Sequence, residues 1–290
     1  MDWGCIWFGM RIRFLGTGTS AGVPVIACGC GVCTSTDPRD TRTRTSATVE
    51  FVDADGQERV ILIDASPDLR EQVLREGMTR VDAILVTHNH VDHVWGLDEI
   101  RRFNEVMKQP IEVWADAHTH GSLRRVYQHI FEKEKNIQKS FIADLVPREL
   151  RAGESIELFG MRITPMTLMH GKQAILGFRF EAGAGIADPG GVLPLAYCTD
   201  VVEIPDESRV YLEGAQGGVE TLVLDALRDR PHPTHFTVEQ AVVEAGRIGA
   251  SRTYFVHMTH DLAHAATTRA LPEGVELAYD GLIVGDASGS

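Results

Sequence analysis

The sequence predicts an α/β (α+β) fold in which two β-sheets pack face to face and helices cover the outer faces. Strand-like apolar runs are numerous in both halves of the 290-residue chain, and helical stretches are mixed among them, which does not fit a simple doubly wound sheet. No long or flexible linker divides the halves. We therefore expect a single domain over residues 10–285, with residues 1–9 as an N-terminal extension and residues 286–290 as a tail.

The first half opens with β-rich segments. Apolar, β-branched runs predict strands at 10–16, 45–53, 59–64, 81–87 and 111–114, and the turn-like DADGQ joins the second and third of these. Helices are predicted at 67–76, where Ser66 would be the N-cap before Pro67, at 97–107 and within 116–138. His118, His120 and His129 fall in the last helical region, and we interpret them as surface residues.

The second half repeats this mixture of strands and helices. Apolar runs predict strands at 155–158, 161–168, 175–181, 192–199, 221–225 and 252–257, and the closing VELAYDGLIV predicts two more short strands. Helices are predicted at 237–248 and from residue 261 onward. The two β-rich halves, each with helices, are what predicts two packed sheets.

Composition favours a globular protein of the cytoplasm. The chain has 41 acidic and 28 basic residues, giving a formal charge of −13, and this balance argues against a nucleic-acid partner. No apolar run approaches the roughly 18 residues of a membrane span. The opening MDWGCIWFG lacks the basic region of a signal peptide, and Met10, directly before the first predicted strand, is an alternative start of translation.

THNHVDH, residues 87–93, is the first candidate site. It follows the predicted strand 81–87, at the end where α/β folds usually place their chemistry. Neutral imidazoles and a carboxylate are ligands for zinc, manganese or iron. In an extended segment His88 and His90 point to the same side and suit one ion, whereas Asp92 and His93 follow a turn and suit a second ion.

Further ligands are needed to close two metal sites. His170, Asp200 and His257 each follow an apolar run, which places them at the same end of the sheets as THNHVDH. We expect His170 to complete the first site and His257 the second. Asp200 would bridge, because a carboxylate reaches two ions roughly 3.5–4 Å apart.

The cysteines predict a separate structural metal site. The chain has five, and CGCGVC groups Cys28, Cys30 and Cys33 within six residues, which is unlike a disulfide framework. Three thiolates leave zinc in need of a fourth ligand. Cys5 has no clustered partner, and Cys198, in a strand-like run, is interpreted as a small core residue.

These motifs resemble a known superfamily. THNHVDH, followed in order by His170, Asp200 and His257, resembles the metallo-β-lactamase superfamily. The opening FLGTGTSAGVPVIACGCGVC and the late HMTH are similar to the phosphoribosyl 1,2-cyclic phosphate phosphodiesterases of the carbon–phosphorus lyase pathway. The resemblance runs in blocks from about Arg11 to Val284. It implies a four-layer αββα sandwich with two divalent ions, manganese or zinc, in the active site.

The resemblance also assigns roles to single residues. It implies that His260 completes a structural zinc site with the three clustered cysteines. It implies that Asp64 supports a ligand imidazole through a hydrogen bond. His235, in HPTHFTVEQ, matches a histidine that faces the substrate phosphate and suits general acid catalysis, while His232 is expected to be structural. Lys172 is expected to contact a phosphate, and Asp92 counts as catalytic as well as ligating.

The implied activity is that of a metal-dependent phosphodiesterase acting on a small cyclic or ribose-linked phosphate. A hydroxide bridging the two ions would attack, and His235 would protonate the leaving oxygen. Three alternatives stay open: a transfer-RNA 3′ endonuclease-like nuclease, a thioesterase or lactonase, and a non-catalytic accessory protein of pyrroloquinoline quinone biosynthesis. As partners we expect a small phosphorylated substrate and no membrane. The sequence is also compatible with a homodimer.

Overall fold

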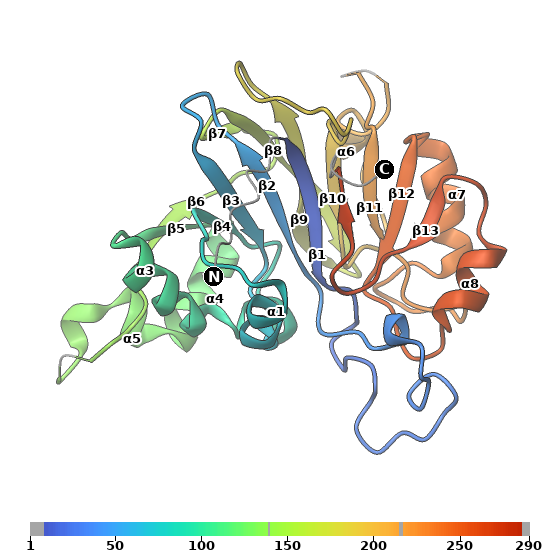
Figure 1. The fold of residues 1–290 in the computed structure, drawn as a ribbon, viewed down its shortest axis with the longest axis horizontal. Helices are drawn as coiled ribbons and strands as arrows, with labels where there is room; N and C mark the ends of the chain where they lie inside the picture. The colour runs from blue at the N-terminus through green and yellow to red at the C-terminus, as the bar shows by residue number, and fades with distance from the viewer. Residues whose placement is uncertain (1–8, 139, 215–216, 286–290) are drawn as a thin grey trace.

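The predicted αββα sandwich is confirmed by a computed structural model, which describes residues 9–138, 140–214 and 217–285 (Figure 1). Within these ranges two seven-stranded sheets face each other. The first has the order β14 (Ile283–Val284), β1 (Met10–Gly16), β2 (Ser46–Val52), β3 (Glu58–Ile63), β4 (Ala83–Leu85), β5 (Ile111–Ala115) and β6 (Leu145–Glu149). The second has the order β13 (Val275–Leu277), β12 (Arg252–Val256), β11 (Thr221–Asp225), β10 (Leu195–Cys198), β9 (Gln173–Ala182), β8 (Met161–His170) and β7 (Ile156–Leu158).

Helices cover the outer face of each sheet, as Figure 1 shows. The first sheet carries α1 (Leu69–Glu76), α3 (Arg101–Met107), α4 (Ala117–Val126) and α5 (Gln128–Phe131), and the second carries α6 (Asp206–Arg209), α7 (Val238–Ile248) and α8 (His264–Ala270). Helix α2 (Val91–Val94) and three short 3₁₀ helices, at Pro38–Asp40, Leu97–Ile100 and Lys133–Lys135, lie in connections. None of the described helices is long and apolar enough to cross a membrane.

The strands bury side chains on both faces because each sheet packs against the other sheet on one face and against helices on the other. In β3, Ile61 and Ile63 point into the core between the sheets, whereas Leu62 points into the core under the helices of the first half. In β11, Val223 belongs to the central core and Leu222 to the outer core of the second half. This alternation follows from the two-residue period of a strand, and it explains why these strands read as continuous apolar runs.

The strand directions bring the candidate residues to one edge. In the second sheet β10, β11 and β12 are parallel, and β9 is antiparallel to both β8 and β10, so β8 runs with β10. Asp200, Asp225 and His257 therefore come at or just after the carboxyl ends of neighbouring strands. In the first sheet β3 and β4 are parallel, so Asp64 and His88 also follow neighbouring strand ends.

Three sequence expectations need correction. Helix α1 begins at Leu69, and Ser66 does not cap it; its Oγ instead accepts a hydrogen bond from the Asp68 amide at 3.2 Å in the preceding turn. The helix expected at 97–107 starts as a 3₁₀ turn and becomes α-helical only from Arg101. Strand β6 was not predicted, because Pro147 interrupts its pattern; as an edge strand it tolerates a residue without an amide proton.

Residues 1–8 of the expected N-terminal extension, Cys5 among them, and the expected tail 286–290 lie outside the described residues.

Candidate functional site

Two groups of ligand-type side chains meet at the shared strand-end edge. Within each group one ligand atom from every residue lies within 4.8 Å of the others. The first group is His88, His90 and His170, and the second is Asp92, His93, Asp200 and His257. All seven residues that the sequence singled out as active-site ligands therefore gather at one point.

Asp200 lies between the two groups. Its Oδ2 is 3.3 Å from His93 Nε2, and its Oδ1 is 3.1 Å from His257 Nε2. It also forms a group with His170, within the same 4.8 Å limit, although His170 belongs to the other ligand group. A carboxylate in this position can offer one oxygen to each of two ions.

The backbone at this edge adopts conformations that side chains disfavour. Asp64, Asp200 and His257 have φ of 59°, 57° and 61°, in the left-handed region. Such conformations cost of order 1–3 kcal/mol at a residue other than glycine and persist where the surrounding structure fixes them, often at functional sites. Each of the three residues comes one or two positions after the end of a strand, beside the candidate ligand groups.

Buried imidazole nitrogens test whether ions fit these groups. His88 Nε2 is buried and has no hydrogen-bond or ion-pair partner in the described part of the chain, whereas the buried His93 Nε2 lies close to carboxylate oxygens of Asp92 and Asp200, 3.4 and 3.3 Å away. Leaving such a nitrogen unpaired costs about 1–3 kcal/mol. Three imidazoles in one group, and two imidazoles with two carboxylates in the other, are donor sets suited to zinc or manganese. The residues therefore fit the divalent ions that the sequence implies.

A buried carboxylate orients two of these imidazoles. Asp64 Oδ2 lies 2.7 Å from His93 Nδ1 and accepts a hydrogen bond from Thr87 Oγ1 at 2.8 Å, while Oδ1 accepts from the Thr87 amide at 2.8 Å. Thr87 Oγ1 in turn lies 3.0 Å from His88 Nδ1. With both Nδ1 atoms held in this way, Nε2 of His88 and of His93 is left to face the ligand groups.

Charge is concentrated at this edge, and it shifts several pKa values. Burial alone would raise the pKa of Asp200, but His257 and His93 outweigh it and hold that pKa well below its usual range. Burial, reinforced by His93, lowers the pKa of His88 well below its usual value. For His93 burial also acts to lower the pKa, but Asp200 and Asp92 raise it well above the usual value. The carboxylates therefore favour a cation at this point.

His235 lies beside both ligand groups. Its ring stacks on that of His257, with centroids 4.7 Å apart and 12° between planes, and lies 4.6 Å from the ring of His170. Its Nδ1 is 2.6 Å from Oδ2 of Asp225, which also accepts a hydrogen bond from the Val201 amide at 3.0 Å. Burial, with His257 adding to it, lowers the pKa of His235 to about 3. The ring is therefore neutral at pH 7 before substrate binds.

Asp225 is the site residue that sequence reasoning missed. It ends the strand TLVLD, and an acidic residue at the end of a buried strand is the same signal that marked Asp200. The side chain is fully buried, and burial raises its pKa well above the usual value.

The other predicted residues lie around this edge. Lys172 is exposed in the turn between β8 and β9, two residues after His170, and its amine has no hydrogen-bond or ion-pair partner among the described residues. His232 Nδ1 is 3.1 Å from Thr234 Oγ1, and its ring centroid is 5.1 Å from that of His235.

Two of the three histidines expected at the surface, His118 and His129, are exposed as predicted. For His120 the prediction is wrong. Its side chain is buried, with Nε2 2.7 Å from the Arg148 carbonyl oxygen.

The clustered cysteines meet His260 at a second place. Sγ of Cys28, Cys30 and Cys33 lies 3.3, 3.5 and 3.3 Å from His260 Nδ1. A tetrahedral zinc ion with ordinary bond lengths separates sulfur and nitrogen ligands by roughly 3.5 Å. A hydrogen bond from the Cys33 amide lowers the pKa of Cys30 to about 6, which favours the thiolate that zinc requires. The four side chains therefore fit a closed zinc site.

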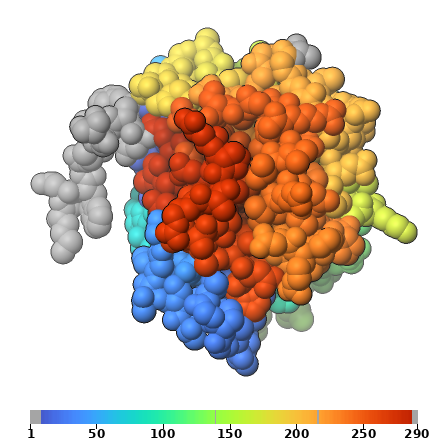
Figure 2. All heavy atoms as spheres, turned by 90° about the vertical axis from the view of Figure 1, so that its right-hand side faces the viewer, coloured from blue at the N-terminus to red at the C-terminus, as the bar shows by residue number. Residues whose placement is uncertain are grey.

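This cysteine site joins distant parts of the chain. Figure 2 shows the blue N-terminal part packed against the orange-red C-terminal part at the lower edge of the molecule. His260 follows the active-site candidate His257 by three residues, so one loop carries a member of each site. Arg42, fully buried, donates hydrogen bonds from the N-terminal part to the carbonyl oxygens of Thr259 and Leu262, at 2.8 and 2.6 Å.

Replacing Cys30 by serine should release one zinc ion per chain under mild chelation and lower the melting temperature. Because a site that exists only in the folded state adds its binding energy to stability, we expect a fall of about 5 °C or more, which corresponds to roughly 2 kcal/mol. Zinc content after chelation and thermal melting measure the two effects. The buried, lone Cys198 is the matched control, since Cys198→Ala should keep this zinc. A disulfide among the three clustered cysteines in reduced, metal-replete protein would contradict the site.

One family profile and several curated proteins match the chain. The profile described as "Beta-lactamase superfamily domain" matches residues 59–258. The chain is 33% identical over 275 residues to an octanoyltransferase of Porphyromonas gingivalis, which covers 94% of this chain and 51% of that protein. It is 26% identical over 224 residues to a coenzyme PQQ synthesis protein B of Methylorubrum extorquens, covering 71% of this chain and 70% of that one. The chain therefore spans about half the length of the octanoyltransferase. The activity in the name of that protein is not carried over to this chain.

Solved structures extend the comparison. A diphosphatase of the PhnP family is 40% identical, with a TM-score of 0.81 over 95% of this chain and 97% of that one. Zinc-bound PqqB of Methylobacterium extorquens is 20% identical, with a TM-score of 0.70 over 94% and 99% of the two chains. The short form of human tRNase Z is 17% identical, with a TM-score of 0.65 over 95% and 99%. The last two likenesses concern the fold alone.

Proposed function

Because the chain belongs to the beta-lactamase superfamily, we propose that its paired ligand groups hold two divalent ions and hydrolyse a phosphodiester bond in a small substrate. The observation that carries phosphoryl chemistry is the position of His235. It is an imidazole assigned to neither ligand group, placed beside both and backed by a buried carboxylate. The 40% identity to a structure described as a PhnP-family diphosphatase supports the same class of substrate.

Each ligand group would hold one ion. His88, His90 and His170 would hold one ion, and Asp92, His93 and His257 the other, with Asp200 between them. Two divalent ions in such a site, zinc or manganese, polarise phosphoryl oxygens and lower the pKa of water toward neutrality. Asp64 and Thr87 already orient the imidazoles in the substrate-free site, which is the kind of preorganisation that favours catalysis.

His235 would deliver a proton to the leaving oxygen. Asp225 accepts the hydrogen bond from Nδ1, which leaves Nε2 as the atom that can exchange a proton with substrate. The pKa of about 3 in the substrate-free site means that the ring must gain its proton when substrate binds. The negative charge of a bound phosphate raises the pKa of an adjacent imidazole. His235 would therefore act as a general acid only in the complex with substrate.

The substrate is expected to be small and to carry negative charge. Lys172 is exposed two residues after His170, within the turn that leads to the ligand groups, and its unpaired amine suits a phosphate oxygen. The net charge of −13 disfavours a long polyanion such as RNA, whose binding depends on neutralising many phosphates.

Metal-replete protein should hydrolyse phosphodiesters and should lose this activity on chelation. A panel tests the proposal: bis-(p-nitrophenyl) phosphate, ribose cyclic phosphates, cyclic nucleotides, a dinucleoside diphosphate, precursor transfer RNA, a thioester and a lactone. We expect turnover of small phosphorylated compounds to exceed that of RNA, and activity to return with added Mn²⁺ or Zn²⁺. Preference for the thioester or lactone, or no turnover despite two bound ions per chain, would reject the proposal.

A further inference from the structure

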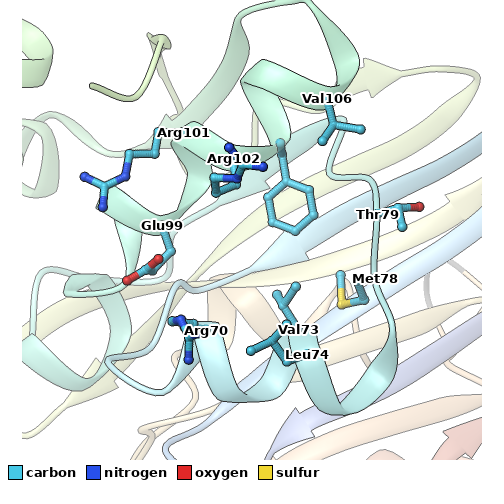
Figure 3. A pocket seen from close by; sticks show the side chains of 10 residues that line it. Arg70, Val73, Leu74, Met78, Thr79, Glu99, Arg101, Arg102 and Val106 are labelled. Atoms are coloured by element: carbon cyan, nitrogen blue, oxygen red, sulfur yellow. The ribbon is translucent and has the colours of Figure 1, made fainter. Parts of the chain in front are cut away.

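A groove runs between helices α1 and α3 on the outer face of the first sheet (Figure 3). Its volume is about 500 Å³. Val73, Met78 and Phe103 form an apolar floor, and Leu74 and Val106 line it from the two helices while remaining 62% and 60% exposed. Large apolar side chains left this exposed on neighbouring helices are typical of an interaction surface.

The groove is separate from both metal-ligand groups. None of the residues that line it belongs to a group of possible metal ligands. The metal-ligand groups therefore do not account for the apolar surface of the groove.

We propose that this face is covered by a second copy of the same chain, related by a two-fold axis. In such a dimer the same patch serves both partners, so it must be complementary to itself. The groove meets this condition in shape because it combines a hollow with protruding apolar side chains. Leu74 of each copy would enter the hollow floored by Phe103 of the other, and Val106 would pack beside it.

The charges around the groove are also complementary to themselves. Arg70 and Glu99 both line it, and neither has an ion-pair partner in the part of the chain that the structure describes. Under a two-fold axis Arg70 of each copy faces Glu99 of the other, so one contact forms twice. By contrast, Arg101 and Arg102 already pair with Asp98 and Glu105 of their own chain, and they remain at the rim.

This pattern matches the anatomy of a homodimer interface and fits other occupants less well. Such interfaces have an apolar centre depleted of charge and a polar rim. An acidic peptide or a small anion would need an excess of positive charge facing it, whereas the unpaired charges here are one of each sign. Both helices are fixed to the sheet below by buried side chains such as Leu69 and Phe103, so the face is preformed.

Sedimentation equilibrium of the full chain between about 1 and 200 µM tests the proposal. We expect a dimer, and we expect Leu74→Glu to raise its dissociation constant by at least about a hundredfold, since a charge would then be buried in both halves of the interface. The matched control is Val243→Glu on α7, a side chain that is 67% exposed and far along the chain; it should leave the dimer intact. Both sites are exposed, so thermal melting should show that each variant folds.

A charge exchange makes the test specific to this face. Arg70→Glu and Glu99→Arg should each weaken the dimer about tenfold, because each places like charges opposite one another, and the double variant should recover most of the loss. A wild-type chain that stays monomeric at 200 µM overturns the proposal. So does a dimer that survives Leu74→Glu, because its interface then lies elsewhere. Hydrolase activity is measured in parallel, so that failure of the dimer and failure of the proposed function remain distinguishable.

Discussion

Replacing Asp200 by alanine should abolish metal-dependent turnover. The two oxygens of Asp200 lie 3.3 Å from His93 and 3.1 Å from His257 in the second ligand group, and Asp200 also lies within 4.8 Å of a ligand atom of His170 in the first, so its loss would remove the carboxylate that we propose bridges the two ions. Two ions contribute several kcal/mol of charge stabilisation in the transition state. At about 1.4 kcal/mol per factor of ten, we expect kcat to fall by roughly 10³ or more.

Metal content separates this effect from unfolding. The Asp200→Ala protein should bind fewer than two ions in the active site and should keep the zinc at the cysteine site, which shares no ligand with it. Asp206→Ala is a matched control, because that side chain is 99% exposed on α6 and touches neither site. Full activity of Asp200→Ala, or two tightly bound active-site ions in that variant, would exclude the bridging role.

Local patterns in the sequence were enough to predict most of the strands. The runs at 59–64, 161–168 and 221–225 correspond to β3, β8 and β11 within one or two residues, because strands buried on both faces consist of continuous apolar residues. The strand β6 was missed because its sequence LVPRE has no such run and contains Pro147. The other edge strands, β7, β13 and β14, were predicted, so the cause lies in the sequence of β6 and not in its position at the edge.

Candidate ligands were predictable from the sequence where they follow a strong strand signal. His170, Asp200 and His257 were found in this way, and the structure brings them together. The contact between Asp225 and His235 was not found, because it joins residues ten apart whose approach depends on the return of the chain from β11. The same limit applies to His120, whose burial against Arg148 comes from the packing of α4 on β6 and not from any pattern in the helix.

Replacing His235 by alanine should lower turnover by roughly 10²–10⁴ while leaving the metal content unchanged. This is the usual scale for losing a positioned proton donor. We assign His235 a role other than ligation because its Nδ1 lies 2.6 Å from Asp225, although the ring also lies within 4.8 Å of ligand atoms of His170, Asp200 and His257. His232→Ala is the matched control. That imidazole lies next to His235 but is held by Thr234, and its loss should change turnover by much less.

The leaving group decides whether His235 donates a proton. A sugar alkoxide is a poor leaving group and needs protonation, so the full defect should appear with a ribose cyclic phosphate. A p-nitrophenolate leaves without a proton, so the defect of His235→Ala should shrink toward the level of His232→Ala when bis-(p-nitrophenyl) phosphate is used. Equal losses on both substrates would mean that His235 binds the phosphate and does not act as an acid. Loss of a metal ion from the variant would make it a ligand, and Asp225, 2.6 Å from its Nδ1, would then be the carboxylate that orients that ligand.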